Sequence, residues 1–213
     1  KFKRAKFPIS QFSKTLFPDK MACKLRYVAE NRFVNPTVAT PGVYVFTANG
    51  CFDPDITGTG HQPRGFDQIM AMYNHYVVVS SKITVHFMTP YEETVNGNTI
   101  YGISLRGSSV AFTDVNDYME YRNTSYKVLA HTPETGGVKT ITKTFSAKQF
   151  LGRSSALADP DLKGSSAGNP QEQAFFHCWA AETSPSIDPD ASRIVAQIDY
   201  NIVFIEPKAP DQS

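Results

Sequence analysis

Short segments in which apolar and polar residues alternate constrain this chain more than any other feature of its sequence. In the first of them, Leu25, Tyr27 and Ala29 alternate with charged residues such as Lys24 and Arg26. Alternation with a period of two is typical of a β-strand that buries one face. Similar segments, or segments rich in β-branched and aromatic residues, recur along the chain and predict eight strands. The expected strands are 21–30, 43–52, 82–87, 99–108, 125–130, 138–145, 173–182 and 196–204.

Helical patterns are few and short. They lie at 66–73, at 115–119 after the N-cap candidate Asp114, and at 147–151 between Ser146 and Gly152. Long loops rather than regular crossover helices join the strands, which argues against a parallel α/β fold. We therefore expect an all-β fold: a single eight-stranded antiparallel jelly roll, which is a two-sheet β-sandwich, with long loops and short inserted helices. An up-and-down barrel would need tighter hairpins, and an immunoglobulin sandwich is usually shorter.

The length and the apolar content of the chain fit one folded domain. The chain has 213 residues, of which 41% are apolar and 19% are charged, and this composition excludes a fully disordered protein. No apolar run approaches the roughly 18 residues of a membrane-spanning helix, so we expect no membrane partner. The expected organisation is a basic N-terminal arm at 1–20, a jelly-roll domain at 21–207 and a C-terminal tail at 208–213.

The positive charge is concentrated near the N-terminus. The chain carries 21 basic and 20 acidic residues, yet 8 of the basic residues lie within the first 26 positions beside a single acid, Asp19. This asymmetry favours a polyanion-binding arm, because cationic side chains neutralise phosphates and interleaved aromatic rings stack on unpaired bases. The candidate nucleic-acid-binding residues are Lys1, Lys3, Arg4, Lys6, Lys14, Lys24 and Arg26. The alternatives are a solubilising tail and an arm that Phe2 and Phe7 anchor to the domain.

The sequence contains no local motif for catalysis. The five histidines show neither HxH nor HxxxH spacing, and no GxSxG, Walker or GxGxxG motif occurs. We therefore expect no enzyme activity, no catalytic residues and no cofactor. The tripeptide Asp-Pro-Asp occurs at 53–55, 159–161 and 188–190, and it favours turns because proline restricts φ and aspartate hydrogen-bonds the nearby backbone. Loop carboxylates also suit calcium, which makes Asp53 and Asp55 candidate ligands.

One loop segment carries a more specific signal. The stretch 52–68, which reads FDPDITGTGHQPRGFDQ, closely resembles a segment in the capsid proteins of circovirus-like CRESS-DNA viruses, which have circular single-stranded DNA genomes. The resemblance extends over roughly residues 20–205. The supporting stretches are 73–78, 123–129, 159–164 and Phe175-Phe176.

The resemblance implies a capsid protein with a single jelly roll that self-assembles into a small icosahedral shell. The shell would be of the T=1 type with about sixty copies, and the basic arm would face packaged single-stranded DNA. The implied location is the virion, and the host nucleus or cytoplasm during assembly. Loops 49–74 and 146–172 would form subunit contacts or outer surface. One feature departs from the pattern: such capsid proteins usually carry a long arginine-rich tail, whereas this chain starts with a modest lysine-led one.

Besides a jelly-roll enzyme, for which the sequence shows no local motif, two other classes of protein stay open at the level of the sequence. The first is a soluble jelly-roll binding module, such as a lectin-like domain, which would explain the strands and the aromatic residues but not the basic arm. The second is a capsid protein of a small RNA virus, because related jelly rolls also occur there. The sequence does not indicate a host receptor.

Overall fold

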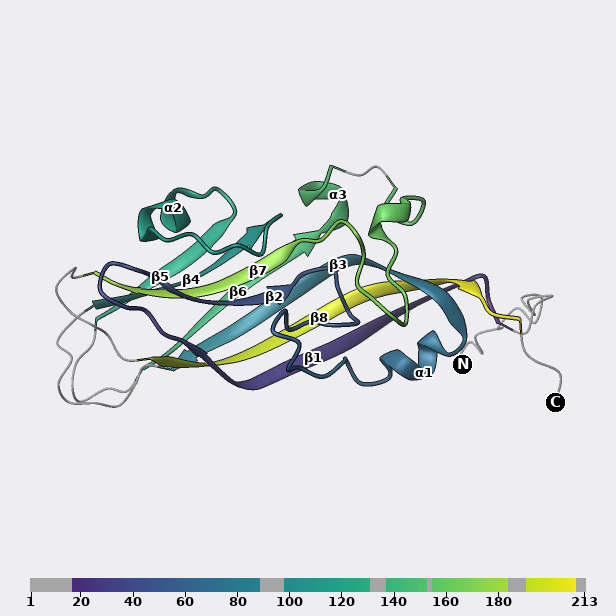
Figure 1. Cartoon of the computed structure of the whole chain (residues 1–213), viewed down its shortest axis with the longest axis horizontal. Coiled ribbons are helices and arrows are strands. Elements are labelled where there is room, and N and C mark those ends of the chain that lie inside the picture. Colours follow the sequence, from purple (N-terminus) through teal and green to yellow (C-terminus); the bar gives the residue numbers. More distant parts are fainter. Residues whose placement is uncertain (1–16, 89–97, 131–136, 153–154, 184–190, 210–213) are drawn as a thin grey trace, which may run out of the picture.

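The computed structural model describes residues 17–88, 98–130, 137–152, 155–183 and 191–209 (Figure 1). This part of the chain forms two four-stranded sheets with the orders β1-β8-β3-β6 and β2-β7-β4-β5. All neighbouring strands are antiparallel. The strands are β1 (Lys20–Val34), β2 (Gly42–Thr47), β3 (Tyr73–Met88), β4 (Asn98–Arg106), β5 (Thr124–Ala130), β6 (Val138–Ser146), β7 (Phe175–Glu182) and β8 (Ser192–Pro207).

The chain passes from one sheet to the other at almost every step. Only β4 and β5 are consecutive strands that pair within one sheet. Two sheets built from interleaved strands in this order form the double Greek key of a jelly roll. The predicted eight-stranded, all-β jelly roll is therefore confirmed. Because β1 pairs with β8, the first and last strands lie side by side, with Lys20 opposite Ile205.

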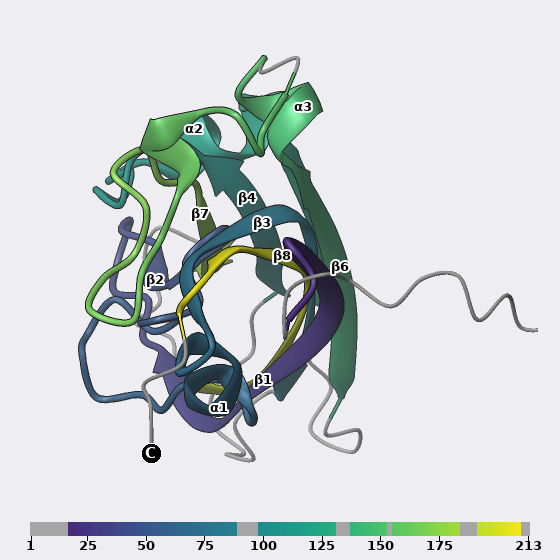
Figure 2. The same ribbon diagram turned by 90° about the vertical axis from the view of Figure 1, so that its right-hand side faces the viewer.

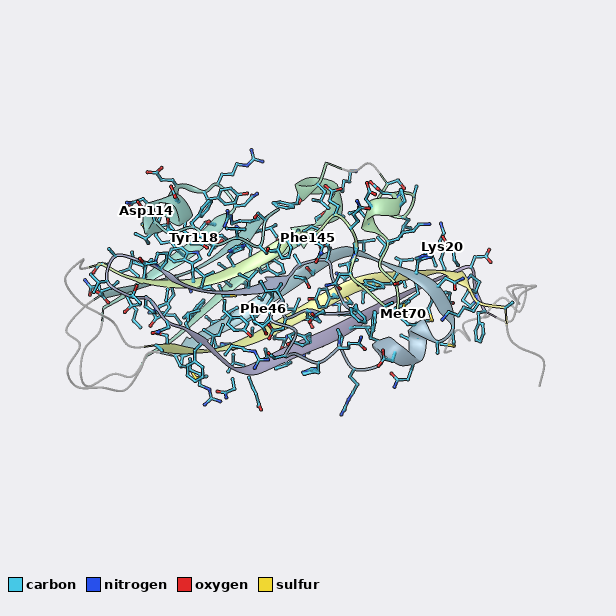
Figure 3. The ribbon with its side chains drawn as sticks, in the orientation of Figure 1. Lys20, Phe46, Met70, Asp114, Tyr118 and Phe145 are labelled. Atoms are coloured by element: carbon cyan, nitrogen blue, oxygen red, sulfur yellow. The ribbon has the colours of Figure 1, made fainter. Side chains whose placement is uncertain are left out.

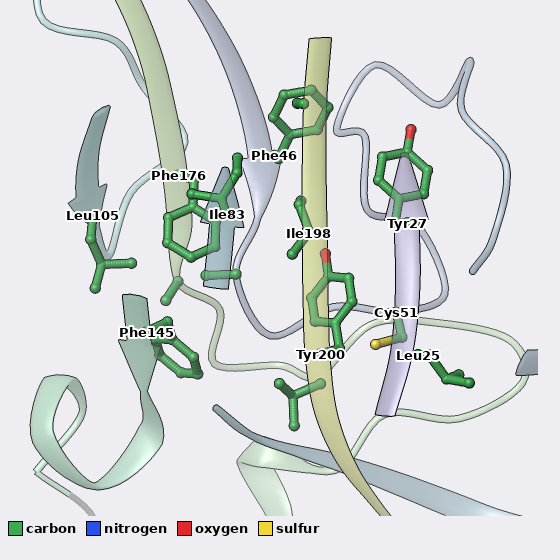
Figure 4. Packing of buried hydrophobic residues seen from close by; sticks show 14 of the residues in the cluster. Leu25, Tyr27, Phe46, Cys51, Ile83, Leu105, Phe145, Phe176, Ile198 and Tyr200 are labelled. Atoms are coloured by element: carbon green, nitrogen blue, oxygen red, sulfur yellow. The ribbon is translucent and has the colours of Figure 1, made fainter. Parts of the chain in front are cut away.

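The core fills the space between the inner faces of the two sheets (Figures 3 and 4). On β1 the expected alternation is observed: Leu25 and Tyr27 are buried, whereas Lys24 and Arg26 are exposed. Large aromatic side chains from both sheets meet in this core, and each removes a large apolar area from water. Among the buried ones are Phe46, Phe145, Phe176 and Tyr200.

Three short helices interrupt the strands: α1 (Phe66–Met70), α2 (Val115–Glu120) and α3 (Ala147–Phe150). The predicted N-cap of α2 is confirmed, because the Asp114 carboxylate accepts a 2.8 Å hydrogen bond from the backbone N–H of Asn116. The helical pattern at 66–73 extends too far. Tyr73 is instead the first residue of β3, where it pairs with Pro207. Pairing with β8 therefore determines the extended conformation of Tyr73, although the local periodicity is helical.

Several strand boundaries differ from the sequence prediction, and the differences are largest in β2 and β3. β2 ends at Thr47 rather than at residue 52, since the Thr47 hydroxyl donates to the Gly50 carbonyl and the chain turns there. The buried residues after Thr47 resemble a strand only in composition. β3 is much longer than the predicted 82–87, because its first half follows β8 across an irregularity between Val78 and Ser80.

The segment 155–172, which is polar and rich in turn-forming residues, is partly integrated into the body of the domain. It contains a 3-10 turn, Pro160–Leu162, and Leu162 is buried. The backbones of Gly164 and Tyr76 exchange two 2.9 Å hydrogen bonds. A Cβ at position 164 would collide with the Tyr76 ring, so only glycine allows this approach. A polar segment can be buried in this way when its backbone groups find partners, which composition does not reveal.

Candidate nucleic-acid interface

Lys24 and Arg26 lie on the exposed face of the sheet β1-β8-β3-β6. Arg26 forms a bidentate ion pair with Asp199 of β8. Its Nε donates to Oδ1 at 2.6 Å, and its Nη2 donates to Oδ2 at 3.3 Å. Partial burial alone would raise the pKa of Asp199, but the hydrogen bonds from Arg26 and the nearby charge of Lys24 bring it below its ordinary value. Asp199 therefore stays ionised and holds Arg26 in position.

The strand register extends this charged surface across the sheet. In the strand register Asp199 stands between Arg26 of β1, with which it forms an ion pair, and Lys82 of β3. We call the exposed side chains Lys20, Lys24, Arg26, Lys82 and Arg193 the basic sheet face. The strands that carry these five cations contain three acids, Glu30, Asp199 and Glu206. Glu206 forms ion pairs with His75 and Lys163 rather than with a member of the basic sheet face. The face therefore carries an excess of positive charge, which is the electrostatic signature of a phosphate-binding surface.

Three members of the basic sheet face were not among the sequence candidates: Lys20, Lys82 and Arg193. Lys82 had a signal, because it alternates with Ile83, Val85 and Phe87, and this parity places it on the outer face of β3. Its proximity to Arg26 depends on the pairing of β1 and β3 with β8 and has no local signal. The other candidates, Lys1, Lys3, Arg4, Lys6 and Lys14, lie outside the described residues.

The calcium candidates Asp53 and Asp55 have different surroundings. The Asp55 side chain is fully buried and accepts hydrogen bonds from Arg32 Nε at 2.8 Å and from the Tyr44 hydroxyl at 2.7 Å through the same oxygen, Oδ2. Its other oxygen, Oδ1, accepts from the backbone and the hydroxyl of Thr57. Burial alone would raise the pKa of Asp55, but these hydrogen bonds lower it overall. The arrangement is that of a buried ion pair, and the calcium site stays a prediction.

The described residues contain neither a cluster of three metal-ligating side chains nor a membrane-spanning helix. Within ranges 17–88, 98–130, 137–152, 155–183 and 191–209, no three His, Cys, Asp or Glu side chains gather closely enough to hold an ion. Helices in the same ranges are all too short or too polar to cross a bilayer.

Comparison with known proteins finds similarity among solved structures only. No protein-family model matches the chain, and no curated protein matches it either. Among solved structures, one of cocksfoot mottle virus shares 10% identity over 90% of this chain and 98% of that chain, with a TM-score of 0.49. A tobacco necrosis virus structure shares 14% identity over 90% and 98%, with a TM-score of 0.48. The decameric BFDV capsid protein shares 11% identity over 87% and 99%, with a TM-score of 0.40. The fold assignment rests on the strand order itself.

Proposed function

We propose that this chain is a viral capsid protein that self-assembles into a small icosahedral shell of T=1 type and packages single-stranded nucleic acid. The observation that carries the proposal is the jelly-roll strand order combined with a basic sheet face and a basic N-terminal segment. A shell protein needs a rigid module that repeats and a cationic side that neutralises genome phosphates. The role is structural, so the protein needs no catalytic centre.

The resemblance of segment 52–68 to circovirus-like capsid proteins favours single-stranded DNA as the genome. This segment packs along the free edge of β1. The His61 ring shares a 3.0 Å hydrogen bond between its Nε2 and the Val28 carbonyl, and Asp55 binds Arg32. Covering a strand edge prevents unspecific pairing with strands of other molecules, so subunit contacts are left to the loops. In this proposal loops 49–74 and 146–172 contribute those contacts, and the virion is the site of action.

The first test is the size and nucleic-acid content of the purified protein at moderate salt. We expect uniform closed particles in sedimentation and negative-stain microscopy, with raised absorbance at 260 nm relative to 280 nm. Digestion of the extracted nucleic acid with DNase or RNase distinguishes a DNA genome from the RNA alternative. A monomer that persists across salt, pH and calcium and binds glycans would overturn the proposal in favour of a lectin-like module.

The second test separates the arm from the sheet face. Replacing Lys1, Lys3, Arg4 and Lys6 with alanine should lower the packaged nucleic acid, and the double variant Lys24→Ala/Lys82→Ala should lower it further. The matched control removes two exposed cations elsewhere, Arg64→Ala/Lys148→Ala, and should leave the 260/280 nm ratio unchanged. Equal packaging in all variants would refute nucleic-acid binding by the arm and the basic sheet face.

A further inference from the structure

A cavity of about 530 Å³ lies where the edge strands β5 and β6 face each other. One wall is the turn that follows α2, and the other is the end of β6 together with α3; these helices lie on the same side of the sandwich (Figures 1 and 2). The cavity has the size of a small-ligand site. The lining residues are Leu105, Tyr121, Arg122, Asn123, Lys143, Thr144, Ser146, Gln149 and Phe150.

The walls of the cavity are held by backbone and side-chain contacts. The Asn123 carbonyl accepts a 3.0 Å hydrogen bond from the Leu105 N–H, which fixes the first wall to β4. Phe150 packs edge-on against Phe145 with the ring centres 6.1 Å apart, which fixes α3 to the core. Ligand-binding groups on such anchored walls are held in place before the ligand arrives, which lowers the entropic cost of binding.

Lys143 is unusual because it occupies a position of β6 whose alternation places it on the face turned towards the core. Ile141 and Phe145, two residues away on either side, are buried in the core. The Lys143 ammonium is half-buried, and among the described residues its one hydrogen bond goes to Ser125 Oγ at 3.3 Å. Burial lowers the pKa of Lys143, because the charged form loses hydration without gaining a carboxylate. An anionic ligand would supply that missing charge.

The composition of the lining specifies the ligand further. Among the described residues that line the cavity, Arg122 and Lys143 are the two charged ones and none carries a carboxylate. An arginine fork and a lysine ammonium are the usual groups that hold a phosphate. Tyr121 and Phe150 supply aromatic surface, on which a nucleobase can stack, and the Asn123 and Gln149 amides can hydrogen-bond base edges.

We propose that this cavity binds one nucleotide of a single-stranded nucleic acid, with the phosphate at Arg122 and Lys143 and the base against Tyr121 and Phe150. The choice of nucleic acid as the source of the nucleotide rests on the proposed function. The described lining of the cavity includes none of the residues of the basic sheet face. It would fix individual nucleotides, whereas the arm neutralises phosphates without positioning them.

The test is equilibrium binding of dAMP to the assembled protein, with inorganic phosphate and deoxyadenosine as comparison probes. We expect dAMP to bind more tightly than either comparison probe. Arg122→Ala and Lys143→Met should each weaken dAMP binding at least tenfold, while the methionine preserves the apolar stem of Lys143. Lys148→Ala removes an exposed cation of α3 that does not line the cavity, and it should change dAMP affinity less than twofold.

Three outcomes would overturn the inference. Equal dAMP affinity in wild type and both variants, with unchanged thermal midpoints, would leave Lys143 as an edge-protecting charge only. Phosphate binding as tight as dAMP binding would make the cavity a free-anion site. Particles that package nucleic acid normally while the protein shows no dAMP binding would refute the cavity and leave the capsid function standing, whereas absence of particles would refute that function.

Discussion

Asp55 illustrates how strongly one residue can depend on partners far along the chain. Its carboxylate is fully buried and is satisfied by Arg32, Tyr44 and Thr57, which come from β1, from β2 and from the loop of Asp55 itself. Asp53, two residues earlier, is partly buried, and burial together with the charge of Asp55 raises its pKa. The same Asp-Pro-Asp tripeptide therefore holds one acid whose pKa is lowered in the fold and one whose pKa is raised.

Asp55→Asn should destabilise the fold by about 3 kcal/mol at neutral pH, because it leaves the Arg32 guanidinium without its buried counter-charge. The pKa of Asp55 is lowered on folding, so its contribution is present above the unfolded pKa and is lost as pH falls through the folded pKa. Urea denaturation followed by fluorescence of the single tryptophan measures both effects. Asp53→Asn is the matched control, and we expect a change below about 0.5 kcal/mol.

At the scale of elements, α2 depends on the sheet beneath it. A helix of six residues is too short to be stable alone, so packing must hold it. Tyr118 of α2 stacks on Trp179 with ring centres 5.2 Å apart, and Trp179 in turn lies over Gly102, where any Cβ would collide with the indole. The Tyr118 hydroxyl also shares a 3.2 Å hydrogen bond with Nδ1 of the buried His177.

Burial lowers the pKa of His177 to about 4, and the positive charge of Arg106 contributes in the same direction. The neutral ring is therefore stabilised by folding: its contribution is complete above the unfolded value near 6.5 and declines as pH falls from there towards 4. We expect the unfolding free energy to drop by about 2–3 kcal/mol over this range. His177→Gln should remove most of this slope in urea denaturation at several pH values.

His86 provides the control for this prediction. It is only partly buried and its Nδ1 contacts the Thr140 hydroxyl at 2.8 Å on the outer face of the sheet. His86→Gln should retain the acid slope of the wild type. A slope that persists in His177→Gln and disappears in His86→Gln would contradict the assignment of acid sensitivity to the docking of α2.

At the scale of the whole molecule, contacts near both ends of the described chain hold it to the jelly roll. The apolar core of the described residues begins with Phe17, which packs against it, and the Pro18 carbonyl accepts a 2.9 Å hydrogen bond from Tyr73. At the other end, Lys208, which sequence assigned to the tail, donates to the Met70 carbonyl through Nζ at 2.9 Å. We therefore expect that stability and the proposed nucleic-acid binding can be changed independently.

Deleting residues 1–16 should leave the thermal unfolding midpoint of the dissociated protein within about 3 °C of the full chain, because the deletion removes no residue of the described core. The same deletion should reduce packaged nucleic acid and weaken the dependence of packaging on salt. Calorimetry and the 260/280 nm ratio of purified particles provide the two readouts. A large fall in the midpoint, or full packaging without these residues, would show that the two roles are not separable.

Much of the fold could be predicted from the sequence because alternation is a local property. Leu25 and Tyr27 are two residues apart and therefore lie on one face of their strand, which must be buried whichever strand pairs with it. The same holds for Ile83 and Val85. The candidate site was predictable only in part. Lys24 and Arg26 were found by their charge and parity, but Lys82 joins them through two strand pairings that no local pattern encodes.

The sequence by itself determined the all-β class, the number of strands, the charged N-terminal segment and the cap of α2, since each depends on residues within a few positions of one another. Only the tertiary structure decided which strands pair, that Asp55 meets Arg32, and that Arg122 and Lys143 line one cavity. These contacts join residues more than twenty positions apart. They form because the burial of two complete sheet faces selects one strand order, and this selection acts on the whole chain at once.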